Sequence, residues 1–440
     1  MDTKALRQKI LDLAIHGKLV SQDPNDEPAS VLLERIRAEK ERLIKEGKIK
    51  KGKKSAKTSD KPHYPFELPK GWAITDIGEL LINRDGERKP VSSAIRCKQK
   101  DKVYDYYGAA GVIDKVDEYL FDERLLLIGE DGANLLSKSK DNAFFADGKY
   151  WVNNHAHVLD ATDKSILDFV AIVINSMKLD DFITGSAQPK LSQDNLNKIP
   201  VMLPPINEQC RILKKVKHWF SLIAMIERCK DNLLKTIKQT KFKILDLAIH
   251  GKLVPQDPND EPASELLKRI NPKAEITCDN PQYGKLPKGW CLCKISSVVD
   301  IVNGKSQKNV ESPTGKYPIY GSGGIIGKAM EYTCLAGSTI IGRKGTINHP
   351  IFVEENFWNV DTAFGMKANN QILEDKYFYC FCLYFDFSKL DKSSALPSLT
   401  KTAIGNLILP IPPLAEQQRI VAKIEELFAQ LDKIESSLQA

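Results

Sequence analysis

The chain has 440 residues, 42% of them apolar, and a formal net charge of +7. This length and composition fit two or more globular domains and exclude a disordered or fibrous chain. No apolar run approaches the length of a membrane span and no signal-peptide pattern opens the sequence, so we expect a cytoplasmic protein that does not enter the membrane.

The excess positive charge lies in one stretch. Residues 37–61 contain eleven Lys or Arg and four Asp or Glu, so the rest of the chain is neutral in sum. The simplest interpretation of this tract is a solvated linker, and an alternative is a segment that lies on a phosphate backbone. With a neutral remainder, nucleic-acid binding requires that basic side chains gather on one face.

In chain order, the first predicted element is a short helix that ends near His16, with Gly17 as its C-terminal stop. Pro24 and Pro28 then break a turn-rich segment, and a second helix is expected over residues 29–46. From residue 66 the chain consists of short apolar, β-branched or aromatic runs separated by Gly, Asp and Asn. This pattern predicts a mainly β domain with some helix, for example over residues 166–177.

A long helix is predicted near the middle of the chain. After the Pro-Pro pair at 204–205, about forty residues pass without Gly or Pro, and apolar residues recur at alternating spacings of four and three. Such a seam is typical of a helix that packs lengthwise against another helix, although an ordinary long helix over a globular core is an alternative. Nine of the eleven seam positions are apolar; the positions are Ile212, Val216, Trp219, Ile223, Ile226, Lys230, Leu233, Ile237, Thr240, Ile244 and Leu247.

The second half of the chain follows the plan of the first. Residues 9–30 and 243–264 differ only at Ser21 and Pro255, LPKGW occurs at 68–72 and 286–290, and PPINEQCRI at 204–212 matches PPLAEQQRI at 412–420. The loops between these motifs diverge, and the clearest case is Gly-Glu-Asp-Gly at 129–132 against Gly-Arg-Lys-Gly at 342–345. The repeat predicts two domains of one fold that present different loop residues.

The offsets of the repeat indicate how the helices pair. The C-terminal helix stops at the repeat position where the N-terminal helix begins, and it continues the seam through Ile420, Ile424, Leu427, Leu431, Ile434 and Leu438, which Leu6, Ile10 and Leu13 complete. We therefore expect one continuous helix, a twin assembled from the two chain ends, and termini that lie close together. The predicted fold class is α+β, with two similar mainly β domains separated by a long antiparallel two-helix coiled coil and related by a pseudo-twofold axis.

The predicted boundaries follow from these motifs. They are 1–46 for an N-terminal helical segment that completes the second rod, 47–65 for the basic linker, 66–203 for the first β domain, 204–270 for the central helix and spacer, 271–285 for a linker, 286–411 for the second β domain and 412–440 for the C-terminal helix.

Three pairs at i, i+2 spacing could suggest metal ligands: Cys291 and Cys293, Cys380 and Cys382, and His155 and His157. The cysteine pairs lack the two-residue gap of structural zinc sites, and alternate positions of a strand would account for them. The histidines also alternate along an expected strand and have no accompanying carboxylate pattern. We therefore expect no metal site.

The motifs, duplicated in this order, identify the chain as similar to the specificity subunit of type I restriction–modification systems, over essentially its whole length. The resemblance rests on two domains that each open with LPKGW and close in PPxxEQxxI, on Gly-Lys-Leu at 17–19 and 251–253, and on the YGSGGIIG and IIGRKGTI loops. It implies that the two domains are target-recognition domains for a bipartite DNA sequence. It also implies that the helices are a spacer and a docking surface.

The partners implied by the resemblance are double-stranded DNA, two adenine-N6 methyltransferase (M) subunits and restriction (R) subunits. No cofactor is expected in this chain, since S-adenosylmethionine, ATP and Mg²⁺ would belong to those partners. The EQxxI helix starts and the GKLV–QDPNDEPAS segments are expected to be exposed partner surfaces.

Two other classes of function are alternatives. A two-headed protein scaffold would use the same architecture without binding DNA. A DNA-modifying enzyme would need a site that the sequence does not contain: neither Pro-Pro pair stands in an Asn/Asp-Pro-Pro-Tyr/Phe motif, and Arg343-Lys344 follow Gly342 where a phosphate-binding loop requires Lys-Ser/Thr. We therefore expect a subunit without catalytic residues.

Loop donors and amides are the usual readers of base edges, while Lys, Arg and backbone amides contact phosphates. The alternative for each residue is an ordinary solvated loop. The predicted DNA-binding residues are Arg84, Lys98, Tyr106, Tyr107, Asn134, Lys138, Gln188 and Lys190 in the first domain, and Lys305, Gln307, Ser322, Lys328, Arg343, Lys344, Thr346, Asn348, Ser398 and Lys401 in the second.

Overall fold

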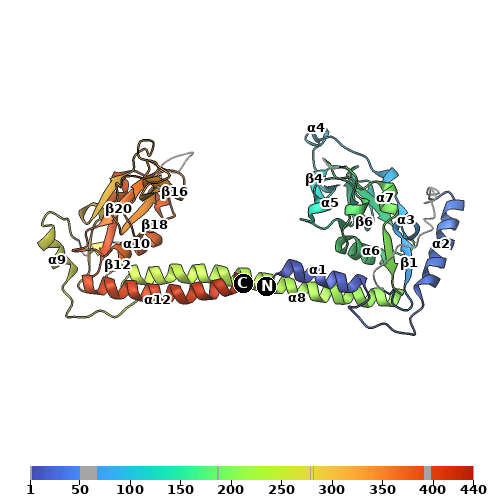
Figure 1. Ribbon diagram of the computed structural model, residues 1–440, viewed down its shortest axis with the longest axis horizontal. Helices are drawn as coiled ribbons and strands as arrows, with labels where there is room; N and C mark the ends of the chain where they lie inside the picture. The colour runs from blue at the N-terminus through green and yellow to red at the C-terminus, as the bar shows by residue number, and fades with distance from the viewer. Residues whose placement is uncertain are drawn as a thin grey trace. The chain divides into compact units, whose positions relative to one another are not determined.

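The computed structural model describes residues 2–49, 67–185, 188–277, 279–280, 282–390 and 398–439. The chain forms two compact units, Asp2–Arg228 and Cys229–Ala440, which we call the N-terminal and C-terminal units (Figure 1). Most of the predicted basic linker lies outside the described residues. Within them, no helix is both long and apolar enough to cross a membrane.

The N-terminal unit contains two four-stranded sheets and a two-stranded ladder. The first sheet is antiparallel, with the order β2 (Ile82–Asn83), β9 (Ala156–Asp160), β6 (Leu125–Gly129), β7 (Ala143–Ala146). The second has the order β4 (Gly111–Val116), β3 (Tyr104–Gly108), β8 (Lys149–Val152), β5 (Phe121–Asp122), with β3 and β8 parallel. The ladder joins β1 (Ala73–Asp76) to β10 (Pro200–Leu203).

Short helices surround these sheets, and one longer helix fills the core. The short elements are α3 (Ile77–Leu80), η1 (Asp85–Glu87), α4 (Ser93–Arg96), α5 (Asn134–Ser137), η2 (Asp180–Phe182) and α7 (Gln193–Asn197). The core helix, α6 (Ser165–Ser176), matches the predicted helix over 166–177. Because it is apolar on nearly every face, most of its residues are buried.

The C-terminal unit repeats this topology. Its antiparallel sheet has the order β14 (Val299–Asn303), β20 (Ala363–Ala368), β17 (Ser338–Gly342), β18 (Ile351–Val353), and its second sheet has the order β16 (Gly324–Ala329), β15 (Tyr317–Gly321), β19 (Trp358–Asn359). A ladder again closes the domain, between β13 (Cys291–Lys294) and β21 (Ile408–Ile411). The remaining elements are β11 (Asp279–Asn280), β12 (Gly284–Lys285), η3 (Ile295–Ser297), α10 (Asp375–Tyr384), η4 (Phe387–Leu390) and α11 (Lys401–Gly405). The prediction of two α+β domains of one fold is confirmed.

The long helix α8 (Ile206–Ile249) is continuous and pairs with a different helix in each unit. In the N-terminal unit, Arg7 of α1 (Thr3–Ile15) pairs with Glu227, and Asp26, farther along the chain, pairs with Arg211. The partner numbers fall as the chain advances, so α1 is antiparallel to α8.

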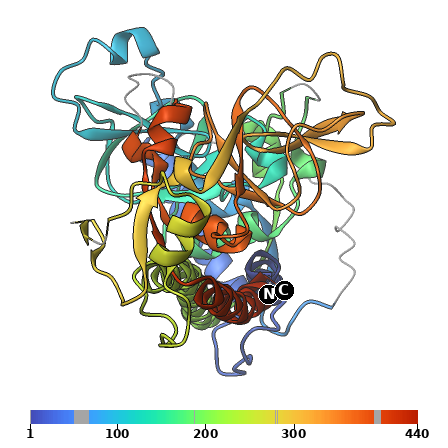
Figure 2. The same ribbon diagram turned by 90° about the vertical axis from the view of Figure 1, so that its left-hand side faces the viewer.

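The C-terminal unit repeats the arrangement with α12 (Leu414–Gln439), which lies beside α8 in Figures 1 and 2. Lys241 of α8 pairs with Asp432 at 2.5 Å, whereas Asp260 pairs with Arg419 at 2.6 Å. The antiparallel pairing that the sequence predicted is confirmed within each unit. The proximity of the two chain ends stays a prediction.

The predicted seam of α8 is only partly correct. Ile212, Val216, Ile223, Ile237 and Ile244 are buried as expected. Trp219, Ile226 and Leu233 are instead 39%, 43% and 40% exposed. A straight helix drifts across a strict seven-residue repeat, and only the side chains that face α1, α12 or a domain are covered.

Both copies of the GKL motif end a helix in the same way. Gly17 has φ +64°, Lys18 N–H donates to Leu13 at 2.9 Å and Gly17 N–H donates to Ala14, which is a Schellman C-cap. Gly251 repeats the geometry with φ +65°. A Cβ on Gly251 would lie 2.3 Å from Pro287 of the second LPKGW motif, so the position excludes any larger residue.

The duplicated motifs meet at one junction in each unit. In the N-terminal unit, Trp72 Nε1 donates to Glu208 at 3.0 Å, Gln22 Nε2 donates to the same carboxylate at 3.2 Å, and Arg211 pairs with Asp26. The N–H of Ala29, at the start of α2 (Ala29–Lys45), donates to the LPKGW backbone at 2.8 Å. The C-terminal unit repeats these contacts through Trp290, Glu416, Gln256 and Arg419, beside α9 (Ala263–Ile270).

This junction corrects the prediction that the EQxxI helix starts are exposed partner surfaces. Glu208, Gln209, Glu416 and Gln417 are all at most 1% exposed. Each Glu accepts bonds from the Trp and Gln of the other motifs, which explains why these three separated motifs recur together. The neighbouring QDPNDEP segments at 22–28 and 256–262 are largely exposed, as expected.

Both cysteine pairs were expected on strands, but only one of them lies on a strand. Cys291 and Cys293 lie on strand β13, as predicted, but Cys380 and Cys382 lie on helix α10 rather than on a strand. All four thiols are buried, and burial raises the pKa of Cys293 and of Cys380 to about 12. All four are core residues.

Candidate nucleic-acid interface

Three segments meet at one end of the C-terminal domain: the hairpin turn at 321–324, the glycine-bracketed loop at 342–345 and the closing segment at 398–401. Leu399 N–H donates to the Arg343 carbonyl at 2.9 Å, and Lys344 forms a β-bridge with Ser398. A Cβ on Gly342 would lie 3.2 Å from the Ser322 Cβ and 1.9 Å from the Thr346 carbonyl, so only glycine allows this approach. The structure thus brings together several predicted residues that are distant in sequence.

The charge at this meeting point is positive. Lys344 and Lys401 are exposed, Arg343 is half-buried with its guanidinium 6.0 Å from the centre of the Phe364 ring, and Lys401 begins α11 directly after its N-cap Thr400. Cations beside exposed backbone suit the phosphates of a nucleic acid.

The N-terminal domain builds the same frame from different side chains. Leu191 N–H donates to the Glu130 carbonyl at 2.8 Å, and the backbones of Asp131 and Lys190 form a β-bridge. A Cβ on Gly129 would lie 2.6 Å from the Ala109 carbonyl. Here the glycine-bracketed loop, 129–132, carries two acids where the other domain carries two bases. The equivalent backbone positions therefore present opposite charge.

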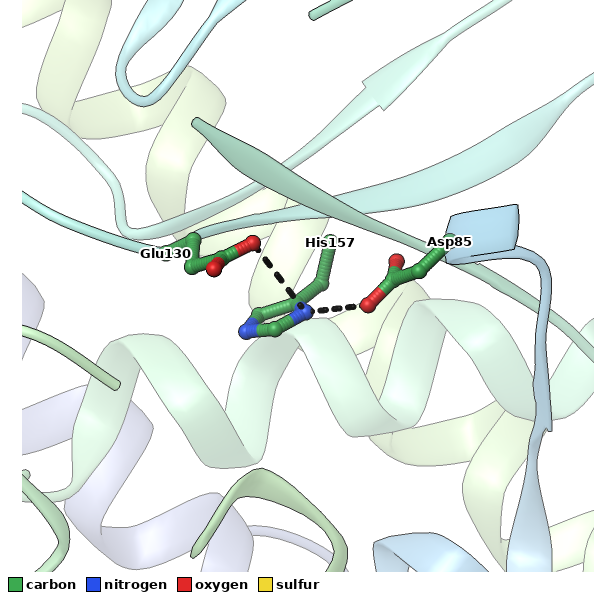
Figure 3. Close-up of side chains that lie close together, drawn as sticks. All are labelled: Asp85, Glu130 and His157. Carbon is green, nitrogen blue, oxygen red and sulfur yellow. Dashed lines mark hydrogen bonds and ion pairs between the residues drawn. The ribbon is translucent and has the colours of Figure 1, made fainter. Parts of the chain in front are cut away.

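A buried charge cluster lies beneath the N-terminal loop (Figure 3). His157 Nδ1 is 2.6 Å from an Asp85 oxygen, and its Nε2 is 2.8 Å from the Leu191 carbonyl. Arg88 bonds Glu130 at 2.7 Å and lies 3.3 Å from Asp85. Bonds led by the one from His157 hold the pKa of Asp85 below its usual value despite its burial.

This cluster does not fit a metal ion. Within the described residues, Asp85, Glu130 and His157 are a group whose ligand atoms come within 4.8 Å of one another. Both ring nitrogens of His157 already face oxygen acceptors, and the Arg88 guanidinium occupies the place of a cation between the two carboxylates. The cluster is an ion network that fixes Glu130 and, through the Leu191 carbonyl, the backbone at the equivalent position of the N-terminal domain.

The equivalent position in the other domain has a different chemistry. His157 pairs with Ile128 across β6 and β9, just as Phe364 pairs with Ile341 across β17 and β20. A buried His therefore supports the acidic loop, whereas a buried Phe supports Arg343. This difference was not predictable from the sequence, because the cluster depends on side chains that lie far apart along the chain.

Several predicted residues are already engaged inside the protein. Arg84 pairs with Glu123 at 2.5 Å and with Glu87 at 2.6 Å, and these bonds raise its pKa. Lys138 donates to the carbonyls of Asn175 and Met177 at the end of α6, and burial lowers its pKa. Both cations are committed to the fold.

The uncharged predictions in the first domain are less accessible than expected. Asn134 is saturated by bonds to Ser139, Lys140 and Asn142, and Tyr107 is half-buried in an aromatic cluster. Tyr106 as a DNA contact is contradicted, since it is only 1% exposed and its hydroxyl bonds the backbone of Val91. Strand alternation placed it on the inner face.

The other predicted residues lie on the surface of their domains. Asn348 donates to Asp386, and Lys190 lies 3.3 Å from Glu130. Gln307, Ser322, Arg343 and Ser398 are half-buried. The exposed residues are Lys98, Gln188, Lys190, Lys305, Lys328, Lys344, Thr346, Asn348 and Lys401.

Comparison with known proteins identifies the family. The model of the type I restriction modification DNA specificity domain matches residues 69–236 and 287–440. Two curated relatives, the specificity subunits of the type I restriction enzymes EcoAI and EcoEI of Escherichia coli, are each 26% identical, over 98% and 99% of this chain and 90% and 91% of theirs. A solved structure from work on complex assembly and conformational transition of the type I R-M system shares the fold, with 17% identity, a TM-score of 0.56, and coverage of 85% of this chain and 94% of that one.

Proposed function

The chain belongs to the family of type I restriction modification DNA specificity domains, and from this premise we propose that it is the DNA-recognition subunit of such a system. It binds DNA without catalysing a reaction, and its two domains each read one half of a bipartite target. The resemblance of both halves of the chain to the same family domain supports one reader per half.

One observation supports the proposal that the DNA target has two different halves. The two domains share strand order and loop frame, yet the glycine-bracketed loops carry Glu130-Asp131 in one and Arg343-Lys344 in the other. Equal frames place each loop in the same way against its groove, while unlike side chains select unlike bases. The two half-sites therefore differ in sequence.

The helices and the near-identical junctions would receive the partners. The exposed QDPNDEP segments occur once in each unit, in the same geometry, so two identical methyltransferase subunits can bind equivalent surfaces. Restriction subunits would join that complex. S-adenosylmethionine, ATP and Mg²⁺ act in those partners, and this chain binds none of them.

Binding-site selection tests the proposal. The purified full-length chain, alone and with its methyltransferase subunits, is incubated with a randomised duplex pool, and bound sequences are determined. The expected result is one bipartite motif with two unlike halves, bound more weakly as salt rises. A chain that enriches no sequence at any salt, while it still binds its protein partners, would be a scaffold.

A further inference from the structure

Each domain carries a β-hairpin with a bulge at the same place. In the N-terminal domain, Tyr106 pairs with Asp114 and Tyr107 pairs with Val112, so Ile113 has no partner on the facing strand. In the C-terminal domain, the equivalent unpaired residue is Ile326, between Ile325 and Gly327. Bulges re-aim side chains and occur often beside functional sites.

The bulge turns two consecutive apolar side chains toward solvent. Val112 and Ile113 are 48% and 57% exposed, and Ile325 and Ile326 are 62% and 55% exposed. A regular strand would direct one residue of each pair to the other face. The pattern of buried and exposed residues is the same along β4 and β16, although only three of the six positions carry the same residue.

These residues do not serve the domain cores. None of the four belongs to a buried cluster of the described residues or to the half-buried shell around one. The bulged residue instead lies over the facing strand, where a Cβ on Gly108 would come within 3.0 Å of Ile113. Two β-branched apolar residues held in water in both copies indicate contact with something outside the domain.

The surroundings of the C-terminal hairpin are basic and suit a polyanion, whereas the loop beside the N-terminal hairpin is acidic. β4 and β16 are the outermost strands of their sheets. Each forms a hairpin with β3 or β15, which is bonded on its other side to β8 or β19. The turn of each hairpin lies against the glycine-bracketed loop, through Ala109 in one domain and Ser322 in the other. Exposed Lys115 and Lys328 follow two residues after the bulge, and Lys115 pairs with Asp105 at 3.1 Å. In a complex with DNA, lysines at these positions would contact phosphates while the apolar pair contacts the bases.

We propose that Val112 and Ile113 in one domain, and Ile325 and Ile326 in the other, contact the 5-methyl groups of thymines in the major groove and so determine specificity in the two half-sites. This inference rests on the proposed DNA recognition. The major groove admits a two-stranded β-ribbon, and the thymine methyl is the apolar group on its base edges, which distinguishes thymine from cytosine.

The test combines protein variants with methyl removal from the DNA. After the bipartite motif is selected, each thymine is replaced in turn by deoxyuridine, which removes only the methyl group. The variants are Ile325→Ser/Ile326→Ser, the milder Ile325→Thr/Ile326→Thr, which keeps β-branching, and Leu335→Thr as a control that is 53% exposed but lies outside the hairpin.

For the wild type, losing a contacted methyl should weaken binding about fourfold, the equivalent of one buried methyl-sized group. The Ser pair should lose a similar factor on thymine DNA, become insensitive to deoxyuridine in one half-site, and retain wild-type sensitivity in the other. Leu335→Thr should behave as the wild type. The Thr pair should show the same direction with a smaller loss.

Other outcomes overturn the inference. If the Ile325→Ser/Ile326→Ser variant keeps the affinity and the thymine-to-deoxyuridine ratio of the wild type, the hairpin does not contact bases, and the proposed function still stands. A variant that binds DNA normally and no longer co-purifies with the methyltransferase subunit makes the hairpin a protein-docking element. If the wild type selects no motif at all, the proposed function and the inference both fall.

Discussion

The indole Nε1 of Trp72 donates a hydrogen bond to the buried carboxylate of Glu208 at 3.0 Å. Trp290 and Glu416 form the same bond at 3.1 Å in the C-terminal unit. Burial raises the pKa of both carboxyl groups. The bond joins the LPKGW motif, which precedes the first strand of each domain, to the first turn of the PPxxEQ helix. It therefore connects each recognition domain to its long helix.

Replacing Trp290 with Phe should destabilise the C-terminal unit by about 1–3 kcal/mol, because it leaves a buried carboxylate without one of its donors. Urea denaturation of the full chain measures the effect. Trp219→Phe is the matched control, since Trp219 is 39% exposed and the substitution should change little. Equal effects of the two variants would show that the hydrogen bond of the junction does not contribute to the stability of the fold.

Asp114 gives a prediction for the pH dependence of stability. The Arg96 guanidinium, 2.7 Å away, is the main reason that the pKa of Asp114 falls from 3.8 to about 2. A lowered carboxyl pKa stabilises the folded state above the unfolded value, and this contribution is lost as the pH falls from about 4 through about 2. Asp114→Asn should therefore be less stable than the wild type at neutral pH, and the difference should shrink across that window in denaturation series. A difference that is constant with pH would contradict the ion pair.

His157→Phe copies the residue found at the equivalent Phe364 and leaves Asp85 buried without its ring partner. Breaking a buried pair of this kind costs about 3–5 kcal/mol. The exposed neighbour His155 provides the control, and His155→Phe should cost far less. If the wild type retained zinc after dialysis and lost it in His157→Phe, our assignment of the cluster as an ion network would be wrong.

Lys344→Ala should weaken DNA binding at low salt and reduce the slope of log affinity against log salt by about 0.9, as expected for one phosphate contact. Arg84→Gln is the control, because Arg84 is committed to Glu87 and Glu123. Its slope should match the wild type. A larger slope change for Arg84 than for Lys344 would place the phosphate contacts elsewhere in the chain.

The length of α8 predicts the number of unread base pairs between the two half-sites. Inserting four helix-forming residues after Lys230 lengthens α8 by about 6 Å, which corresponds to roughly two base pairs. Site selection with this variant should return both half-sites unchanged and a longer gap. An unchanged gap with altered half-site bases would contradict a spacer role for the helix.

The repeat and the helical pattern were sufficient to predict the fold. Near-identity of residues 9–30 and 243–264 and the seam of α8 depend on spacing along the chain, which a sequence displays directly. Gly17 was identified as a helix stop because the left-handed conformation favours glycine.

The predictions that failed depend on which face of an element is covered. Tyr106 lies on the inward-facing side of β3, and Glu208 lies in the first turn of a helix that a segment more than a hundred residues earlier buries. The grouping of Asp85, Arg88 and His157 likewise exists only after folding. Loop residues such as Lys344 could be predicted as DNA contacts because their divergence between copies is visible in the sequence, and that contact stays a prediction.

Methylome sequencing of the host, with and without this gene, tests the central claim most directly. We expect one bipartite N6-methyladenine motif, with two unlike halves around a fixed gap, to disappear when the gene is deleted and to return on complementation. An unchanged set of methylated adenine motifs, in a strain whose methyltransferase subunits are expressed and active, would contradict DNA recognition by this chain.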